Sequence, residues 1–64
     1  MALTKREVEI VKLLSQRYAC KDISEMINIS PRTVETYIER LMYKLRARNR
    51  LALIATYIRE YEKI

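Results

Sequence analysis

Apolar residues recur at helical spacing in four segments of the 64-residue chain. The first segment opens with TKRE at positions 4–7, a capping box in which the Thr4 hydroxyl can accept from a backbone amide while Glu7 reaches back to the Thr4 N–H. Its apolar positions are Val8, Ile10, Val11, Leu14 and Tyr18. They predict a first helix over about residues 4–17.

A second, short helix is expected over about residues 20–27, with Ile23, Met26 and Ile27 on one face. The sequence NISP at 28–31 then predicts a break, because asparagine tolerates the left-handed conformation, serine is a favoured N-cap and proline suits the first helical turn. A third helix is therefore expected over about residues 31–45. Its apolar stripe is Val34, Ile38, Leu41 and Leu45.

Asn49 can cap a fourth helix of about residues 50–62, whose core stripe is expected to be Leu51, Ile54, Ala55 and Ile58. The same helix carries a second apolar stripe, formed by Leu53, Tyr57 and Tyr61. A helix that is apolar on two faces must bury the second one against something. Either a second copy of the chain covers this stripe, as a weak homodimer formed through the fourth helix, or the first helix buries part of it.

The composition favours an all-α fold, because the chain has no glycine and one proline. Strands joined by tight turns normally need residues that tolerate positive φ. Sixty-four residues allow one core, so we expect a single domain over residues 1–64 with a bundle-like arrangement of four helices.

The second and third helices have the layout of a helix-turn-helix. Ser24 supplies the small residue needed where the two helices cross, and Asn28 supplies the positive φ of the turn. Ile29 can attach the turn to the core. These requirements are met in register within residues 20–38, which two unrelated helices would rarely achieve.

The net charge of +5 is concentrated in one part of the chain. Residues 40–50 contain no acid and five bases, namely Arg40, Lys44, Arg46, Arg48 and Arg50. A basic cluster of this kind on a compact domain is typical of proteins that bind polyanions. A solvated basic surface is the alternative.

Other classes of protein find little support. The chain has no histidine, no glycine-rich phosphate loop and no nucleophile beside a base, so we expect neither catalysis nor a cofactor, metal or small-molecule site. Cys20, the lone cysteine, cannot form an internal disulfide and fits a reduced cytoplasmic setting. No apolar run approaches the ~20 residues of a membrane span, so no membrane partner is expected.

Four blocks of sequence resemble the LuxR/GerE-type DNA-binding domain, which is also found at the C-terminus of NarL/FixJ response regulators. LTKRE at 3–7 is similar to the family's LTxRE, and KDIS at 21–24 is similar to NKEIA. ISPRTVET at 29–36 resembles ISxxTVxxH, and KL and NR at 44–45 and 49–50 resemble KLxxxNR. The resemblance covers residues 3–58.

This resemblance implies the sequence-specific DNA-binding output domain of a bacterial transcription regulator. It places the third helix in the major groove of double-stranded DNA, points to pairing through the fourth helix, and leaves RNA polymerase as a candidate partner. The positions that usually read bases are Glu35, Thr36 and Glu39, which the apolar stripe of this helix also predicts to face outward. The residues expected to contact phosphates are Lys21, Arg32, Thr33, Tyr37, Arg40, Lys44 and Arg48. Glu7 and Arg50 are expected to form a structural pair between the first and last helices, or to serve as caps.

The chain departs from the family pattern at three positions. Arg17 stands where a glycine is usual, so the positive φ of that turn is expected elsewhere, around Tyr18 and Ala19. Tyr37 replaces a frequent histidine, and Cys20 a frequent asparagine. Two rival functions remain open. A helix-turn-helix can be reused as a protein-protein interaction module, and sigma-factor region 4 has a similar fold but lacks the second stripe of the fourth helix.

Overall fold

The computed structural model describes residues 3–62, and the two residues at each end of the expected domain lie outside this range. Within it the chain forms four helices and no strand: α1 (Lys5–Ser15), α2 (Cys20–Met26), α3 (Pro31–Lys44) and α4 (Arg50–Tyr61). The expected all-α class is therefore confirmed. Helix α1 ends two residues earlier than predicted, and each of the other three helices ends one residue earlier. None of the helices in this range has the length and apolarity needed to cross a membrane.

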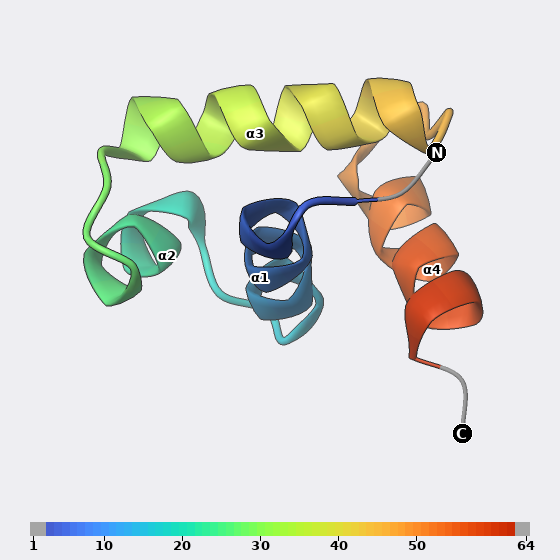
Figure 1. Cartoon of the computed structure of the whole chain (residues 1–64), viewed down its shortest axis with the longest axis horizontal. Helices are drawn as coiled ribbons and strands as arrows, with labels where there is room; N and C mark the ends of the chain where they lie inside the picture. The colour runs from blue at the N-terminus through green and yellow to red at the C-terminus, as the bar shows by residue number, and fades with distance from the viewer. Residues whose placement is uncertain (1–2, 63–64) are drawn as a thin grey trace.

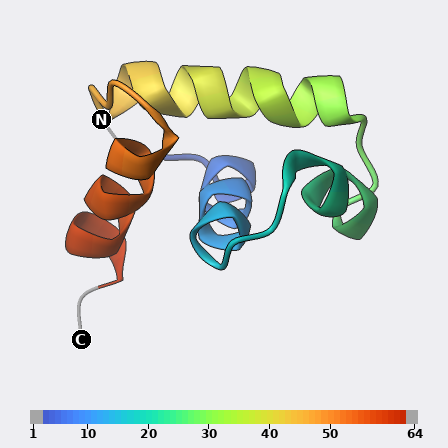
Figure 2. The same cartoon turned by 180° about the vertical axis from the view of Figure 1, so that it is seen from behind.

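The longest helix, α3, lies across the other three along one side of the molecule (Figures 1 and 2). Its N-terminal end covers α2, its middle crosses α1, and its C-terminal end leads into α4 (Figure 1). The core lies beneath α3 and takes residues from all four helices: Ile10, Val11, Leu14, Ile23, Val34, Ile38, Leu41, Leu53 and Tyr57. One face of α3 is thus buried, and the opposite face is left free.

Side-chain caps start α1, α3 and α4 at the residues that the sequence predicts. At α1 the Glu7 amide donates to Thr4 Oγ1 at 3.2 Å, and the Thr4 amide donates to Glu7 Oε1 at 2.9 Å, which completes the capping box. Ser30 Oγ accepts from the Thr33 amide at 3.1 Å, and Asn49 Oδ1 accepts from the Ala52 amide at 2.8 Å. Each bond satisfies an amide that has no partner within its helix.

Three turns connect the helices, and each contains one residue with positive φ. Asn28 adopts φ 60°, as predicted for the helix-turn-helix turn. The expectation for the first turn is wrong, because Arg17 itself adopts the left-handed conformation with φ 73°. Arg46, with φ 54°, does the same after α3. In each turn the next amide donates to a carbonyl five residues earlier, as in a Schellman motif: Tyr18 to Leu13, Ile29 to Ser24 and Ala47 to Met42. These closing bonds hold arginine in a conformation that usually favours glycine.

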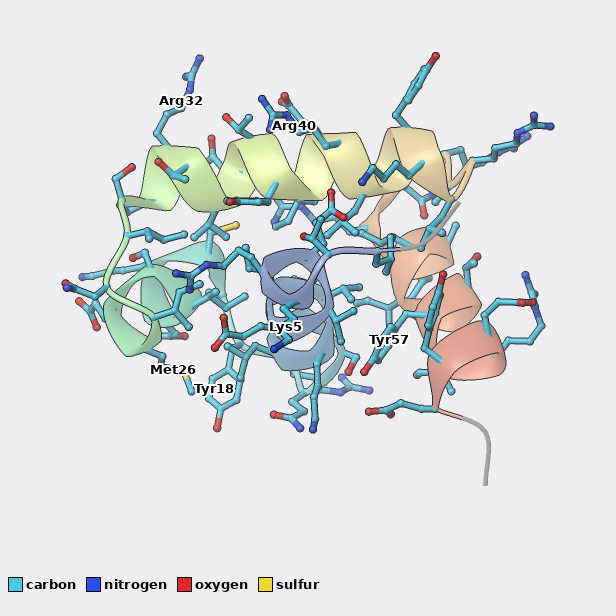
Figure 3. The ribbon with its side chains drawn as sticks, in the orientation of Figure 1. Lys5, Tyr18, Met26, Arg32, Arg40 and Tyr57 are labelled. Carbon is cyan, nitrogen blue, oxygen red and sulfur yellow. The ribbon has the colours of Figure 1, made fainter. Side chains whose placement is uncertain are left out.

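The two apolar stripes of α4 are exchanged relative to the prediction. Leu53 is fully buried and Tyr57 nearly so, whereas Leu51 is 77% exposed and Ile58 46% exposed. Ala55 is also exposed and Ile54 half-buried. Leu53 and Tyr57 belong to one core cluster with Ile10, Val11 and Leu14 of α1. In Figure 3 Tyr57 lies between α4 and α1. This corresponds to the second of the two explanations considered for this stripe. The assignment of Leu53 and Tyr57 to a dimer contact is therefore wrong.

Tyr57 is buried on this face of α4 without leaving its hydroxyl group unpaired. The Tyr57 hydroxyl donates to Glu62 Oε2 at 3.3 Å, and its ring stacks on Tyr61 with ring centroids 5.9 Å apart. Tyr61 is 43% exposed, so it covers the edge of the core from outside. Tyr18 and Met26, which belong to the apolar stripes of the first two predicted helices, are exposed in the turn after α1 and at the end of α2.

Candidate nucleic-acid interface

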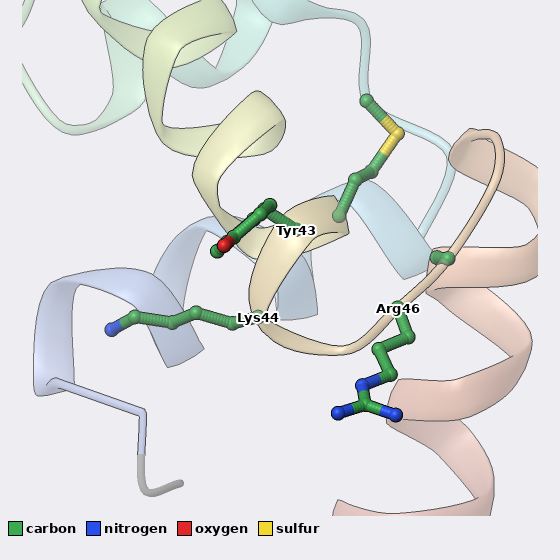
Figure 4. Close-up of a pocket in the computed structure, with 5 residues that line it drawn as sticks. Tyr43, Lys44 and Arg46 are labelled. Atoms are coloured by element: carbon green, nitrogen blue, oxygen red, sulfur yellow. The ribbon is translucent and has the colours of Figure 1, made fainter.

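A buried ion pair fixes the C-terminal end of α3 to the start of α1. Lys44 Nζ lies 2.8 Å from both carboxylate oxygens of Glu7, and Glu7 is only 4% exposed. In Figure 4 the Lys44 side chain extends toward α1. This pair corrects two expectations: Lys44 is committed to Glu7 rather than free for a phosphate, and the partner of Glu7 is Lys44 rather than the exposed Arg50.

The pair makes the stability of the fold dependent on pH. The hydrogen bond from Lys44 lowers the pKa of Glu7 and outweighs burial, which acts in the opposite direction. The folded state therefore binds the Glu7 proton more weakly than the unfolded chain does. The stabilisation is present above the pKa of an exposed glutamate, about 4.3, and is lost as pH falls through the lower pKa of the folded state.

We expect urea unfolding midpoints to fall as pH decreases from 6 to 3, with part of this decrease caused by Glu7. In Glu7→Gln, which cannot ionise at this position, the decrease should be smaller, although stability at pH 6 is lower. Equal pH dependence in both proteins would show that other carboxyl groups account for the whole effect.

The outer face of α3 is free of contacts with the core and carries charges of both signs. Arg32, Glu35 and Glu39 are exposed, as are Arg40 and Tyr43. In Figure 3 Arg32 and Arg40 point away from the body of the molecule. The outward orientation predicted from the apolar stripe is thus confirmed for Glu35 and Glu39. Thr36, between them, is half-buried, and its hydroxyl donates to the Arg32 carbonyl at 3.1 Å.

The remaining expected phosphate contacts lie around this face. Lys21 is exposed in the first turn of α2, Thr33 is exposed in the first turn of α3, and Arg48 is exposed in the turn after α3. Thr33 Oγ1 is 2.8 Å from Ser30 Oγ, so the two hydroxyls share a hydrogen bond. Tyr37 is half-buried on the side of α3.

Tyr43 and Arg46 are not among the residues expected to contact bases or phosphates, and they border a hollow at the C-terminal end of α3 (Figure 4). Tyr43 is 86% exposed and is the most exposed of the large hydrophobic residues in the range 3–62. Arg46 lies in the acid-free run of residues 40–50, and this run was the available signal for it. A large exposed aromatic next to arginines is characteristic of surfaces that meet another macromolecule.

A second hollow lies between the end of α1 and the exposed face of α4. Its walls include Leu14, Tyr18, Leu51, Ile54 and Ile58. Arg17 and Arg50 also border it. The apolar surface left open on α4 is therefore continuous with the turn that follows α1, and it lies away from the outer face of α3.

Together the α2–turn–α3 unit and the free, basic-flanked face of α3 define a helix-turn-helix domain. Residues 1–57 match the family described as bacterial regulatory proteins, luxR family, and the chain belongs to that family. Its domain is the DNA-binding part of transcription regulators, as the resemblance found in the sequence implied.

Three curated relatives are regulatory proteins. The chain is 34% identical to the nitrate/nitrite response regulator protein NarP of Escherichia coli, over 91% of this chain and 27% of the relative. It is 38% identical to the oxygen regulatory protein NreC of Staphylococcus epidermidis, over 81% and 24%. It is 40% identical to the virulence transcription regulator BvgA of Bordetella pertussis, over 81% and 25%. The chain thus spans about a quarter of the length of these relatives. No solved structure gives a significant match.

Proposed function

We propose that this domain binds specific sequences of double-stranded DNA as the output module of a bacterial transcription regulator, with α3 in the major groove. The observation that carries the proposal is the outer face of α3, a 14-residue helix that keeps one side exposed while a helix-turn-helix supports it from below. An α-helix fits the major groove, where base edges distinguish all four base pairs. Glu35, Thr36 and Glu39 occupy the positions proposed to read them.

Phosphate contacts would position α3 without reading sequence. Around the outer face, the residues proposed for this role are Lys21, Arg32, Thr33, Tyr37, Arg40 and Arg48, and Lys44 no longer belongs to the set. The N-terminal turn of α3 adds backbone amides that favour an anion. Within a regulator, such a domain would act in the cytoplasm, where contact with RNA polymerase could couple DNA binding to transcription.

Selection of bound duplexes from a random DNA pool tests this function. The domain is expected to enrich a defined sequence. Heparin should compete only weakly for the domain once it is bound to that sequence, because base contacts add to the attraction between opposite charges. Equal affinity for heparin and for every duplex would mean that the basic surface binds polyanions without sequence recognition. Absence of duplex binding would favour use of the helix-turn-helix as a protein-protein interaction module.

We further propose that two copies pair weakly through the exposed face of α4. The proposal keeps the helix expected from the sequence but moves the contact to Leu51, Ile54 and Ile58, because Leu53 and Tyr57 belong to the core. These residues, with Tyr18, form one continuous apolar surface around the hollow between α1 and α4. A contact of one helix against its mate falls below the ~1,200 Å² of stable interfaces, so affinity should be low unless another domain tethers the copies.

Replacing both Leu51 and Ile58 with glutamate should abolish self-association and cooperative binding to two half-sites, while the fold and half-site binding are retained. Sedimentation at millimolar concentration and binding to a palindromic duplex measure these effects. Met26→Glu is the control for the introduction of a glutamate, since it places one at an exposed apolar residue of α2, outside this face. A wild-type protein that stays monomeric, with cooperativity unchanged in the double variant, would show that this face has a different partner.

A further inference from the structure

The two glutamates of the α3 outer face lack the partners that acidic residues on a helix surface normally have. Three ion pairs are present within residues 3–62, and they involve Glu7, Glu9 and Glu60. Glu35 and Glu39 take part in none of them, although Arg32 and Arg40 are close in sequence. They also stand four residues apart, a spacing at which like charges destabilise a helix. Their placement therefore costs stability within the domain.

On a surface that faces DNA, an unpaired carboxylate is repelled by phosphates and requires a hydrogen-bond donor. In the major groove the donors on base edges are the amino groups of cytosine and adenine. Adenine presents the N7 acceptor beside its N6 amino group. A carboxylate that accepts from N6 would therefore bring its second oxygen close to N7, and these two acceptors repel each other. Cytosine presents its N4 amino group without an acceptor on the same base edge. A carboxylate therefore selects cytosine, whereas the side-chain amide of glutamine selects adenine.

Thr36 has a different group available. Its hydroxyl donates its only proton to the Arg32 carbonyl at 3.1 Å, so it cannot also donate to a base. The γ-methyl makes no such bond and suits the 5-methyl of thymine. This residue is half-buried, so its contact would lie close to the helix surface between the two glutamates.

We propose that α3 is a pyrimidine-reading helix, in which Glu35 and Glu39 each accept from a cytosine N4 amino group and Thr36 contacts a thymine methyl. The assignment rests on the proposed DNA-binding function and specifies what that surface recognises. Residues four apart on a helix are separated by about 6 Å along its axis, and stacked base pairs by about 3.4 Å. The two cytosines are therefore expected about one to two base pairs apart.

The charges of this face support the same conclusion. Arg32 and Arg40 balance Glu35 and Glu39, so the outer face itself has no net charge to attract DNA. Non-specific attraction must come from the neighbouring bases, and close approach of α3 becomes favourable only where the carboxylates find donors. A duplex without suitably placed cytosines would leave two carboxylates facing DNA without a partner, which is a direct penalty against incorrect sites.

The test begins with selection of duplexes by the wild-type domain, followed by measurement of Kd on the selected half-site. Changing a contacted cytosine to thymine should weaken binding by about 5- to 100-fold. Glu35→Gln and Glu39→Gln should each remove the cytosine preference at one position and shift it toward adenine. Glu60→Gln, which makes the same change on α4, is the matched control and should select the wild-type sequence.

The contact of Thr36 is tested separately, by one change in the DNA and one matching change in the protein. Replacing the contacted thymine by uracil removes one methyl and should weaken wild-type binding about fourfold, as expected for one buried carbon. Thr36→Ser keeps the hydroxyl and its bond to Arg32 but lacks the methyl, so it should bind both duplexes equally.

Two results would overturn the assignment while leaving sequence-specific DNA binding intact. One is a wild-type consensus without the paired cytosines. The other is recovery of the wild-type sequence by both glutamine variants with uniformly tighter binding, which would make the glutamates only repulsive charges. Failure of the wild type to enrich any sequence would instead overturn the proposed function and, with it, the assignment.

Discussion

Replacing Leu53 with alanine is expected to lower the free energy of unfolding by about 2–5 kcal/mol, the usual cost of removing a buried leucine side chain. Leu53 is fully buried where α4 packs on α1 and α3. A domain of this length has a total stability of roughly 3–10 kcal/mol, at ~0.05–0.15 kcal/mol per residue. The substitution therefore removes a large part of the stability, and the melting temperature should fall by about 10 °C or more.

Leu51→Ala provides the control on the same helix. Leu51 is 77% exposed, so the same chemical change should cost less than about 0.5 kcal/mol. Chemical unfolding followed by circular dichroism measures both variants. Equal effects at the two positions, or a larger effect at Leu51, would contradict the orientation of α4 and restore the arrangement expected from its apolar pattern.

The second large effect concerns salt. If about six phosphates are neutralised, the slope of log K against log salt should be roughly −5, from ~0.9 per phosphate. The affinity for duplex DNA would then fall about 10³-fold between 50 and 200 mM salt. Fluorescence anisotropy with a labelled duplex at several salt concentrations measures the slope. A flat response would mean that few phosphates are contacted.

Two variants in the basic stretch distinguish a phosphate contact from a structural charge. Arg40→Ala should reduce the magnitude of the slope by about one and weaken all duplexes alike, because Arg40 is exposed on the outer face of α3. Lys44→Ala should leave the slope unchanged but lower stability, because Lys44 is held by Glu7. A reduced slope for Lys44→Ala would show that this lysine leaves Glu7 when DNA binds.

Local features were predictable because neighbouring residues determine them. The capping box at Thr4, the serine and asparagine caps, and the positive φ of Asn28 each follow from a few adjacent side chains and their hydrogen bonds. The outer face of α3 was predictable for a related reason. This helix has a single apolar stripe, so its periodicity defines the opposite face.

Features that depend on which helix packs where were not predictable in this way. Helix α4 has two apolar stripes, and periodicity alone could not decide which of them meets α1. The stripe that contains Leu53 and Tyr57 does so. The partner of Glu7 depended on where α3 ends relative to α1, 37 residues later in the chain. The glycine-like conformation of Arg17 depended on the closing bond from Tyr18 to Leu13, which outweighs the local preference of arginine.

The short turns of this domain also bear on the speed of its folding. The helices are joined by residues 16–19, 27–30 and 45–49, so short loops bring consecutive helices together, although α1 also packs against α4. Little entropy is lost in closing such loops, and helical domains dominated by local contacts fold in microseconds to milliseconds. A domain of modest stability that folds this quickly also opens often. Its native state therefore persists through rapid refolding rather than through a high barrier to unfolding.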